Sequence, residues 1–86
     1  MYVILVYDVN QKRTNKVLKI ARKYLNWVQN SVLEGEISPA KLEKLKFEIS
    51  KVIEDNDSVV IYTFPYKSYK SREVIGSERG GVDIII

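Results

Sequence analysis

The chain has 86 residues, of which 45% are hydrophobic and 29% charged, a composition typical of one small globular domain spanning residues 1–86. It has no cysteine and no histidine, which excludes disulfides, thiolate zinc sites, cysteine nucleophiles and histidine-based hydrolases. The formal net charge is +3, and no apolar run approaches the roughly 18 residues that cross a membrane, so we expect a cytoplasmic protein with no membrane partner.

The first predicted element is a strand over Tyr2–Tyr7, because this run is rich in β-branched and aromatic residues. Both of its alternating side-chain sets are apolar, so we expect both faces of the strand to be buried. Asp8 then begins a turn that runs through Asn10.

A helix is predicted from Thr14, whose hydroxyl can cap it, to about Leu25. Its apolar stripe consists of Val17, Leu18, Ala21, Tyr24 and Leu25. Six basic residues and no acidic residue lie between positions 12 and 23: Lys12, Arg13, Lys16, Lys19, Arg22 and Lys23. Such a run can meet a polyanion, but charge alone favours a merely solvated helix face.

A single strand is predicted over Trp27–Glu34 and is expected to end at Gly35. The next helix begins at Ser38 and Pro39, because a capping hydroxyl followed by proline at the first helical position is a strong start signal. Its apolar stripe consists of Leu42, Leu45, Ile49, Val52 and Ile53, with Phe47 lying off the stripe. Charges of both signs on its outer face are typical of a solvated amphipathic helix.

Asp55 and Asp57 are interpreted as turn formers ahead of a strand over Ser58–Phe64, which is again apolar on both faces. Two further short strands are predicted over Glu73–Ile75 and Val82–Ile86. The loops in this part of the chain carry a second basic group, formed by Lys67, Lys70, Arg72 and Arg79.

We interpret the whole as an α+β, ferredoxin-like βαββαβ sandwich with an extra C-terminal strand. Two helices would cover one face of a four-stranded antiparallel sheet, and nothing within the chain would cover the other apolar face. We therefore expect a homodimer with its sheets packed face to face. The C-terminal strand, residues 82–86, is expected to pair with the edge of the partner's sheet or, alternatively, within its own chain.

Among the acidic residues, Asp8 stands out by its position, because it directly follows a hydrophobic strand that we expect at the centre of the sheet. Position alone favours a structural role for Asp8 as a cap of the following turn. In a homodimer, however, two copies of Asp8 could hold one Mg²⁺ or Mn²⁺ ion, with water and phosphate oxygens completing its shell. Because the chain has no histidine, a metal ion that activates water is the evident route to a hydrolytic nucleophile.

Hydrogen-bonding and basic residues close to Asp8 are candidates to contact phosphates beside the metal. The predicted nucleic-acid contacts are Tyr7, Asn10, Lys12, Arg13, Lys16 and Ser31. Ser31 is also a weaker candidate nucleophile, because no base lies beside it in the sequence. The chain has no aromatic RNA-recognition motif and no Walker or Rossmann glycine motif.

Three motifs occur in order along the chain: Tyr7-Asp8, the run from Gln29 to Gly35, and the run from Asp57 to Tyr62. Together they resemble the family of small CRISPR-associated proteins of spacer acquisition, whose members are described as endoribonucleases or endonucleases. The middle run, Q-N-S-V-L-E-G, is similar to the family signature Q-x-S-V-F-E-G and is the most specific of the three.

The resemblance implies a ferredoxin-like homodimer with an exchanged C-terminal strand, and one divalent cation held by Asp8 of each subunit. It also implies metal-dependent hydrolysis of phosphodiester bonds in RNA or DNA. Asp8 and Ser31 match family positions, and Arg13 is carried over with them.

The resemblance further implies a place in the spacer-integration complex. There the dimer would bridge two dimers of the larger CRISPR integrase, and its basic surface would carry duplex DNA. Single-stranded RNA is a second expected substrate. The alternatives are a DNA-binding scaffold without physiological nuclease activity and a small-molecule regulatory domain, for which the sequence offers no ligand motif.

Overall fold

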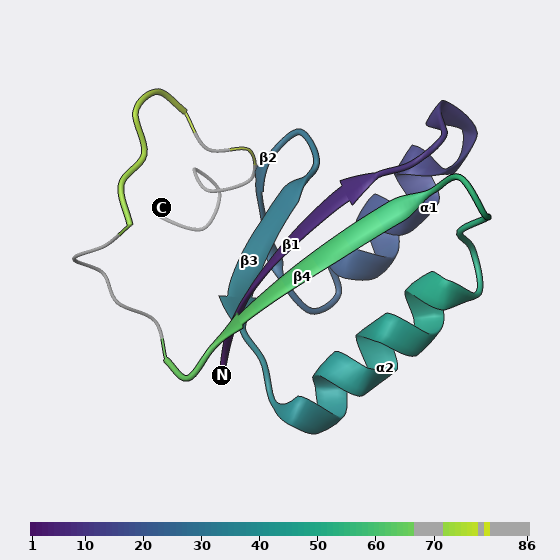
Figure 1. Cartoon of the computed structure of the whole chain (residues 1–86). Helices are drawn as coiled ribbons and strands as arrows, with labels where there is room; N and C mark the ends of the chain where they lie inside the picture. The colour runs from purple at the N-terminus through teal and green to yellow at the C-terminus, as the bar shows by residue number, and fades with distance from the viewer. Residues whose placement is uncertain (67–71, 78, 80–86) are drawn as a thin grey trace.

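The computed structural model describes residues 1–66, 72–77 and 79 (Figure 1). Its elements, in chain order, are β1 (Tyr2–Asp8), α1 (Gln11–Ala21), β2 (Asn26–Gln29), β3 (Val32–Glu36), α2 (Pro39–Ser50) and β4 (Ser58–Phe64). The predicted α+β class, with two helices and four antiparallel strands, is therefore confirmed. No helix in this described part has the length and apolarity needed to cross a membrane.

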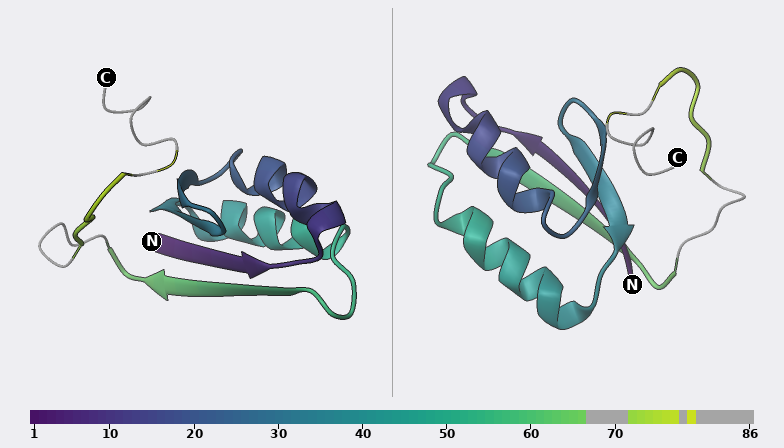
Figure 2. Two further views of the ribbon diagram at one scale, coloured as in Figure 1. Left: turned by 90° about the horizontal axis from the view of Figure 1, so that it is seen from above. Right: turned by 180° about the vertical axis from the view of Figure 1, so that it is seen from behind.

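The four strands form one sheet in the order β2-β3-β1-β4, and every neighbouring pair is antiparallel. β1 is a central strand, with Tyr2 opposite Phe64 at one end of its pairing with β4 and Asp8 opposite Ser58 at the other. Both helices lie on the same face of this sheet, so the protein has two layers (Figure 2).

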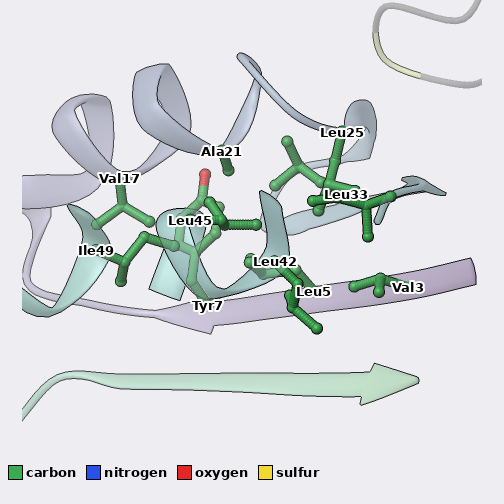
Figure 3. Packing of buried hydrophobic residues seen from close by; sticks show 11 residues of the cluster. Val3, Leu5, Tyr7, Val17, Ala21, Leu25, Leu33, Leu42, Leu45 and Ile49 are labelled. Atoms are coloured by element: carbon green, nitrogen blue, oxygen red, sulfur yellow. The ribbon is translucent and has the colours of Figure 1, made fainter. Parts of the chain in front are cut away.

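The hydrophobic core lies between the sheet and the two helices, and Figure 3 shows side chains of β1 meeting those of α1 and α2 there. Its buried members are Val3, Leu5, Tyr7, Val17, Ala21, Leu25, Leu33, Ile37, Leu42, Leu45 and Ile49. The apolar stripes predicted for both helices are thus confirmed as their buried faces, because residues three and four apart share one side of a helix.

The helix α1 begins earlier and ends earlier than predicted. Its cap is Asn10 instead of Thr14, because the side-chain oxygen of Asn10 accepts a 2.9 Å hydrogen bond from the backbone N–H of Lys12. After Ala21 the chain turns toward β2, and the backbone N–H of Leu25 still donates to the Ala21 carbonyl at 2.9 Å. Leu25 therefore stays in the core although it lies outside the helix.

The single strand predicted over Trp27–Glu34 is wrong, because this segment holds two strands, β2 and β3, joined by a turn at Asn30 and Ser31. Alternating apolar residues continue on both sides of the turn, which hides it from a periodicity argument. Gly35 does not end the strand but lies within β3, opposite Val3. The additional strand supplies the pair between the helices that a βαββαβ order requires.

The second half of the described chain follows the predictions more closely. Ser38 caps α2 by accepting a hydrogen bond from the backbone N–H of Lys41 at 3.2 Å. Val52 and Ile53 lie beyond the end of α2, but both pack against the core. The strand predicted over Ser58–Phe64 is confirmed to the residue as β4.

The strand predicted over Glu73–Ile75 is wrong, because residues 72–77 contain neither helix nor strand. This three-residue segment pairs with no strand in the described part of the chain, and Ile75 is almost fully exposed. The strand predicted over Val82–Ile86 and the basic residues Lys67 and Lys70 lie outside the described residues.

The sheet face that points away from the helices is apolar along β4 and open in a single chain. Val60 is 42% exposed, Tyr62 53% and Phe64 43%, whereas the alternating residues Val59 and Ile61 face the core and are half-buried. The prediction that both faces of the first strand are buried holds fully for the side facing the helices. On the other side Tyr2 is buried, and the remaining two residues, Ile4 and Val6, are half-buried.

Candidate metal and nucleic-acid site at the end of β1

Asp8 is the last residue of β1, where its Cα lies opposite that of Ser58 at the start of β4. Its side chain is exposed and makes no hydrogen bond or ion pair within the described part of the chain. The structural alternative, in which Asp8 caps the following turn, does not apply, because Asn10 is the cap of α1. The carboxylate of Asp8 is therefore available to a ligand.

An exposed, unpaired carboxylate fits a hard cation such as Mg²⁺, which binds through one or two carboxylates and keeps several of its waters. Within residues 1–66, 72–77 and 79 no group of three histidine, cysteine or acidic side chains gathers around a common point. No preformed metal cluster therefore surrounds Asp8 among these residues.

Tyr7 and Ser31 lie at the same end of β1 as Asp8. The backbone N–H of Tyr7 donates to the Ser31 carbonyl at 3.0 Å, which brings the β2–β3 turn beside the end of β1. The side chain of Tyr7 points into the core, and its hydroxyl donates to the Asn30 carbonyl at 3.0 Å. Burial raises the pKa of Tyr7, so its hydroxyl stays a neutral donor that supports the turn.

Asn10 and Arg13 are both engaged by Asp57, from the turn between α2 and β4. The backbone N–H of Asn10 donates to Oδ1 of Asp57 at 2.8 Å. The guanidinium of Arg13 donates from Nε to Oδ2 at 2.5 Å and from Nη2 to Oδ1 at 3.1 Å. The hydrogen bonds from Arg13 hold the pKa of Asp57 far below its ordinary value, and the backbone donors Asn10 and Glu54 add to this effect.

Arg13, predicted from the sequence to contact phosphate, is therefore largely enclosed in an ion pair in this structure. Its side chain is 17% exposed and that of Asp57 2% exposed, and its Nη1 also lies 3.3 Å from Oε2 of Glu54. The prediction that Asp57 forms a turn is confirmed, because its Oδ2 accepts a hydrogen bond from the backbone N–H of Glu54 at 2.9 Å. The contact between Asp57 and Arg13, however, was not anticipated, and the only sequence signal was that Asp57 opens the third motif.

Lys12 and Lys16 are exposed on α1, one helical turn apart, and Lys19 continues the same face. None of these three ammonium groups forms an ion pair within the described part of the chain. Farther along, Lys23 is paired with Glu48, and the guanidinium of Arg22 lies 5.3 Å from the centre of the Trp27 ring. The unpaired positive charge of α1 thus runs along one face of the helix, whose first turn follows closely on Asp8 at the end of β1.

Two of the late basic residues contact the hairpin instead of extending this charged face. Arg79 donates from Nη2 to Oδ1 of Asn30 at 3.0 Å, beside a polar cavity of about 440 Å³ that Ser31 also lines. Arg72 donates from Nε to the carboxylate of Glu34 on β3.

Comparisons with known proteins agree with the resemblance described above. The family model for CRISPR associated protein Cas2 matches residues 1–72. The chain is 59% identical over 81 residues to the CRISPR-associated endoribonuclease Cas2 of Thermotoga maritima, covering 93% of each protein. It is 47% identical to the protein of the same name from Pyrococcus furiosus, covering 100% of both.

Two solved structures that resemble this chain are also Cas2 proteins. A crystal structure of Cas2 superposes with a TM-score of 0.83 at 47% identity, covering 92% of this chain and 90% of the other. The Cas2 of Streptococcus pyogenes, crystallised at pH 6.5, gives a TM-score of 0.79 at 31% identity, covering 88% of this chain and 100% of its own. With the family model spanning most of its length, this chain belongs to the Cas2 family of CRISPR-associated proteins.

Proposed function

We propose that the protein is a metal-dependent endonuclease of CRISPR adaptation, which hydrolyses phosphodiester bonds in RNA or DNA in the cytoplasm. The observation that carries this proposal is the exposed carboxylate of Asp8, which has no partner within the described residues. The relatives from Thermotoga maritima and Pyrococcus furiosus are both named endoribonucleases, which supports the same activity here.

The proposal includes a ferredoxin-like homodimer, because β1 of each chain ends in a single carboxylate, that of Asp8. The apolar, open side of β4, formed by Val60, Tyr62 and Phe64, supports a face-to-face contact between two sheets. Residues 82–86 would add a strand to the partner's sheet. In this assembly the two-fold axis would bring the two copies of Asp8 together.

In the proposed reaction, Asp8 of each subunit would hold one Mg²⁺ or Mn²⁺ ion. When bound, such an ion polarises phosphate oxygens and makes a water molecule more acidic. The ammonium groups of Lys12 and Lys16 would draw the polyanion toward this point and compensate the charge of the phosphates on either side. Asn10 and Ser31 would contribute polar groups at the edge of the same surface.

A second function, compatible with the first, is a DNA-binding scaffold that bridges two dimers of the larger CRISPR integrase. The unpaired lysines of α1 favour it, because Lys12, Lys16 and Lys19 form a positive face that needs no catalytic group to bind a duplex. This scaffold would bind DNA whether or not Asp8 is present.

The experiment that tests the nuclease compares Asp8→Asn with Asp55→Asn, a matched loss of one exposed carboxylate in the turn before β4. Cleavage of single-stranded RNA and of duplex DNA is measured with Mg²⁺ and with Mn²⁺, and the oligomeric state is followed by sedimentation. We expect Asp8→Asn to abolish cleavage while the dimer persists, and Asp55→Asn to cleave like the wild type. If Asp8→Asn also cleaves like the wild type, the carboxylate-pair mechanism is wrong.

A further inference from the structure

The loop that leads from Asp8 into α1 is held by one side chain from a distant part of the sequence. Asp57 accepts four hydrogen bonds, two on each oxygen. Oδ1 accepts the backbone N–H of Asn10 at 2.8 Å and Nη2 of Arg13 at 3.1 Å. Oδ2 accepts Nε of Arg13 at 2.5 Å and the backbone N–H of Glu54 at 2.9 Å.

These four bonds leave the Asp57 carboxylate little freedom to move. Its side chain is 2% exposed, so no bulk water replaces a donor that moves away, and a buried carboxylate without its partners is costly. The pairing with Arg13 is bidentate, so it fixes the orientation of the guanidinium against the carboxylate as well as the distance between them. Asp57 therefore acts as a rigid point to which neighbouring segments are attached.

The segments attached to this point surround Asp8. Asn10 follows Asp8 by two residues and also caps α1, and Arg13 belongs to the first turns of that helix. On the other side, the Cα of Asp8 lies opposite that of Ser58, the residue that directly follows Asp57. Both the strand partner of Asp8 and the loop that leaves it are thus connected to Asp57.

Asp8 itself has no side-chain hydrogen bond or ion pair within the described residues that would fix its direction. The backbone that carries it must therefore set where its carboxylate lies. Two carboxylates that share one ion tolerate a displacement of only about 0.5 Å, so a shift of this loop would separate them from a common ligand position.

We propose that Asp57 is a positioning residue for Asp8, which it places for shared metal binding by holding Asn10 and Arg13 without touching the metal or the nucleic acid. This inference rests on the proposed function at Asp8. It also gives Arg13 a different role from the phosphate contact predicted from the sequence, because the guanidinium that Asp57 holds is part of the support beneath Asp8.

The test uses Asp57→Asn, which keeps one side-chain oxygen but loses the charge that holds Arg13. The matched control is Glu54→Gln, since Glu54 also lies beside Arg13, at 3.3 Å, but is mostly exposed and has no side-chain link to Asn10. Binding of Mn²⁺ to the dimer is followed without nucleic acid, by the electron paramagnetic resonance signal of the free ion. We expect Asp57→Asn to weaken Mn²⁺ binding about 10-fold, as loss of an outer-shell partner does, and Glu54→Gln to leave it unchanged.

Cleavage kinetics separate positioning from a merely structural role. We expect Asp57→Asn to lower kcat at a given Mn²⁺ concentration while KM for RNA stays close to that of the wild type. A variant with lower thermal stability but unchanged Mn²⁺ affinity and kcat would overturn the proposal. If Asp57→Asn does not fold, the same measurements are made on Arg13→Lys, because lysine keeps the positive charge but cannot form the bidentate pair with Asp57. Wild-type Mn²⁺ affinity in that variant would overturn the proposal equally.

Asp8→Asn measured in parallel separates this inference from the proposed function. If Asp8→Asn loses Mn²⁺ binding and cleavage while Asp57→Asn keeps both, positioning by Asp57 is wrong and the metal site stands. If Asp8→Asn keeps both, there is no metal site at Asp8 and nothing for Asp57 to position.

Discussion

The hydroxyl of Tyr2 donates a 2.6 Å hydrogen bond to Oε2 of Glu34, on the sheet face that the helices leave open. Glu34 lies directly opposite Ile4 and is 8% exposed, so a charged group is buried on this face. Arg72 donates to the same carboxylate. The phenol and the guanidinium satisfy this carboxylate, whereas an unpaired one would oppose burial against a second sheet.

The first prediction concerns this buried hydrogen bond. Tyr2→Phe removes the phenolic donor and leaves Arg72 as a partner of Glu34, so we expect the free energy of unfolding to fall by about 1–1.5 kcal/mol. Urea denaturation at one fixed protein concentration measures it. Tyr66→Phe is the matched control, because Tyr66 is largely exposed, and it should change the free energy by less than about 0.5 kcal/mol. Equal effects of the two substitutions would contradict a buried role for the Tyr2 hydroxyl.

The second prediction concerns the open face of β4. Tyr62→Lys places a charge in the middle of the proposed dimer contact, where it would lose its hydration on association, so we expect a shift from dimer to monomer in sedimentation velocity. Phe47→Lys is the control, because Phe47 is 61% exposed on α2, on the helical side of the protein. A wild type that sediments as a monomer, or a Tyr62→Lys variant that remains dimeric, would show that this face is not the contact.

Local sequence signals predicted those parts of the fold that local interactions determine. The start of α2 was predicted from Ser38 and Pro39 because a cap acts within one helical turn. The strand Ser58–Phe64 was predicted to the residue because turn-forming residues and a proline bound it. The hairpin at Asn30 and Ser31 was missed because its turn is only two residues long and carries no glycine.

The candidate site was also predictable only in part, because only its local features leave a signal in the sequence. Asp8 could be singled out because its position at the end of a hydrophobic strand is visible in the sequence. The pairing of Arg13 with Asp57 could not be, because 44 residues separate them and tertiary structure alone brings them together. Arg13 was consequently grouped with Lys12 and Lys16 as a surface cation, although its guanidinium is engaged by Asp57 in the turn before β4.

The third prediction concerns binding of duplex DNA to α1. The double variant Lys12→Gln and Lys16→Gln should bind more weakly and with a shallower salt dependence, by about one unit of slope for each phosphate contact removed. Fluorescence anisotropy at several salt concentrations measures the slope. The control is Lys41→Gln with Lys44→Gln, which makes the same charge change on α2. An unchanged slope in the α1 variant, or an equal change in both variants, would show that α1 is not the DNA-binding face.

The fourth prediction concerns Glu48, through which α2 contacts the turn that follows α1. Hydrogen bonds from Lys23 and then Tyr24 lower the pKa of Glu48 from its ordinary value of 4.5. A lowered pKa in the folded state means that the contribution to stability is complete above pH 4.5 and is lost as the pH falls through the lowered value. We therefore expect Glu48→Gln to have a lower urea midpoint than the wild type at pH 6, with the difference shrinking as the pH falls below 4.5. Glu43→Gln, which removes an exposed pair with Lys46 within α2, should stay close to the wild type throughout. A difference for Glu48→Gln that does not depend on pH would show that its carboxylate charge does not hold α2 to the turn after α1.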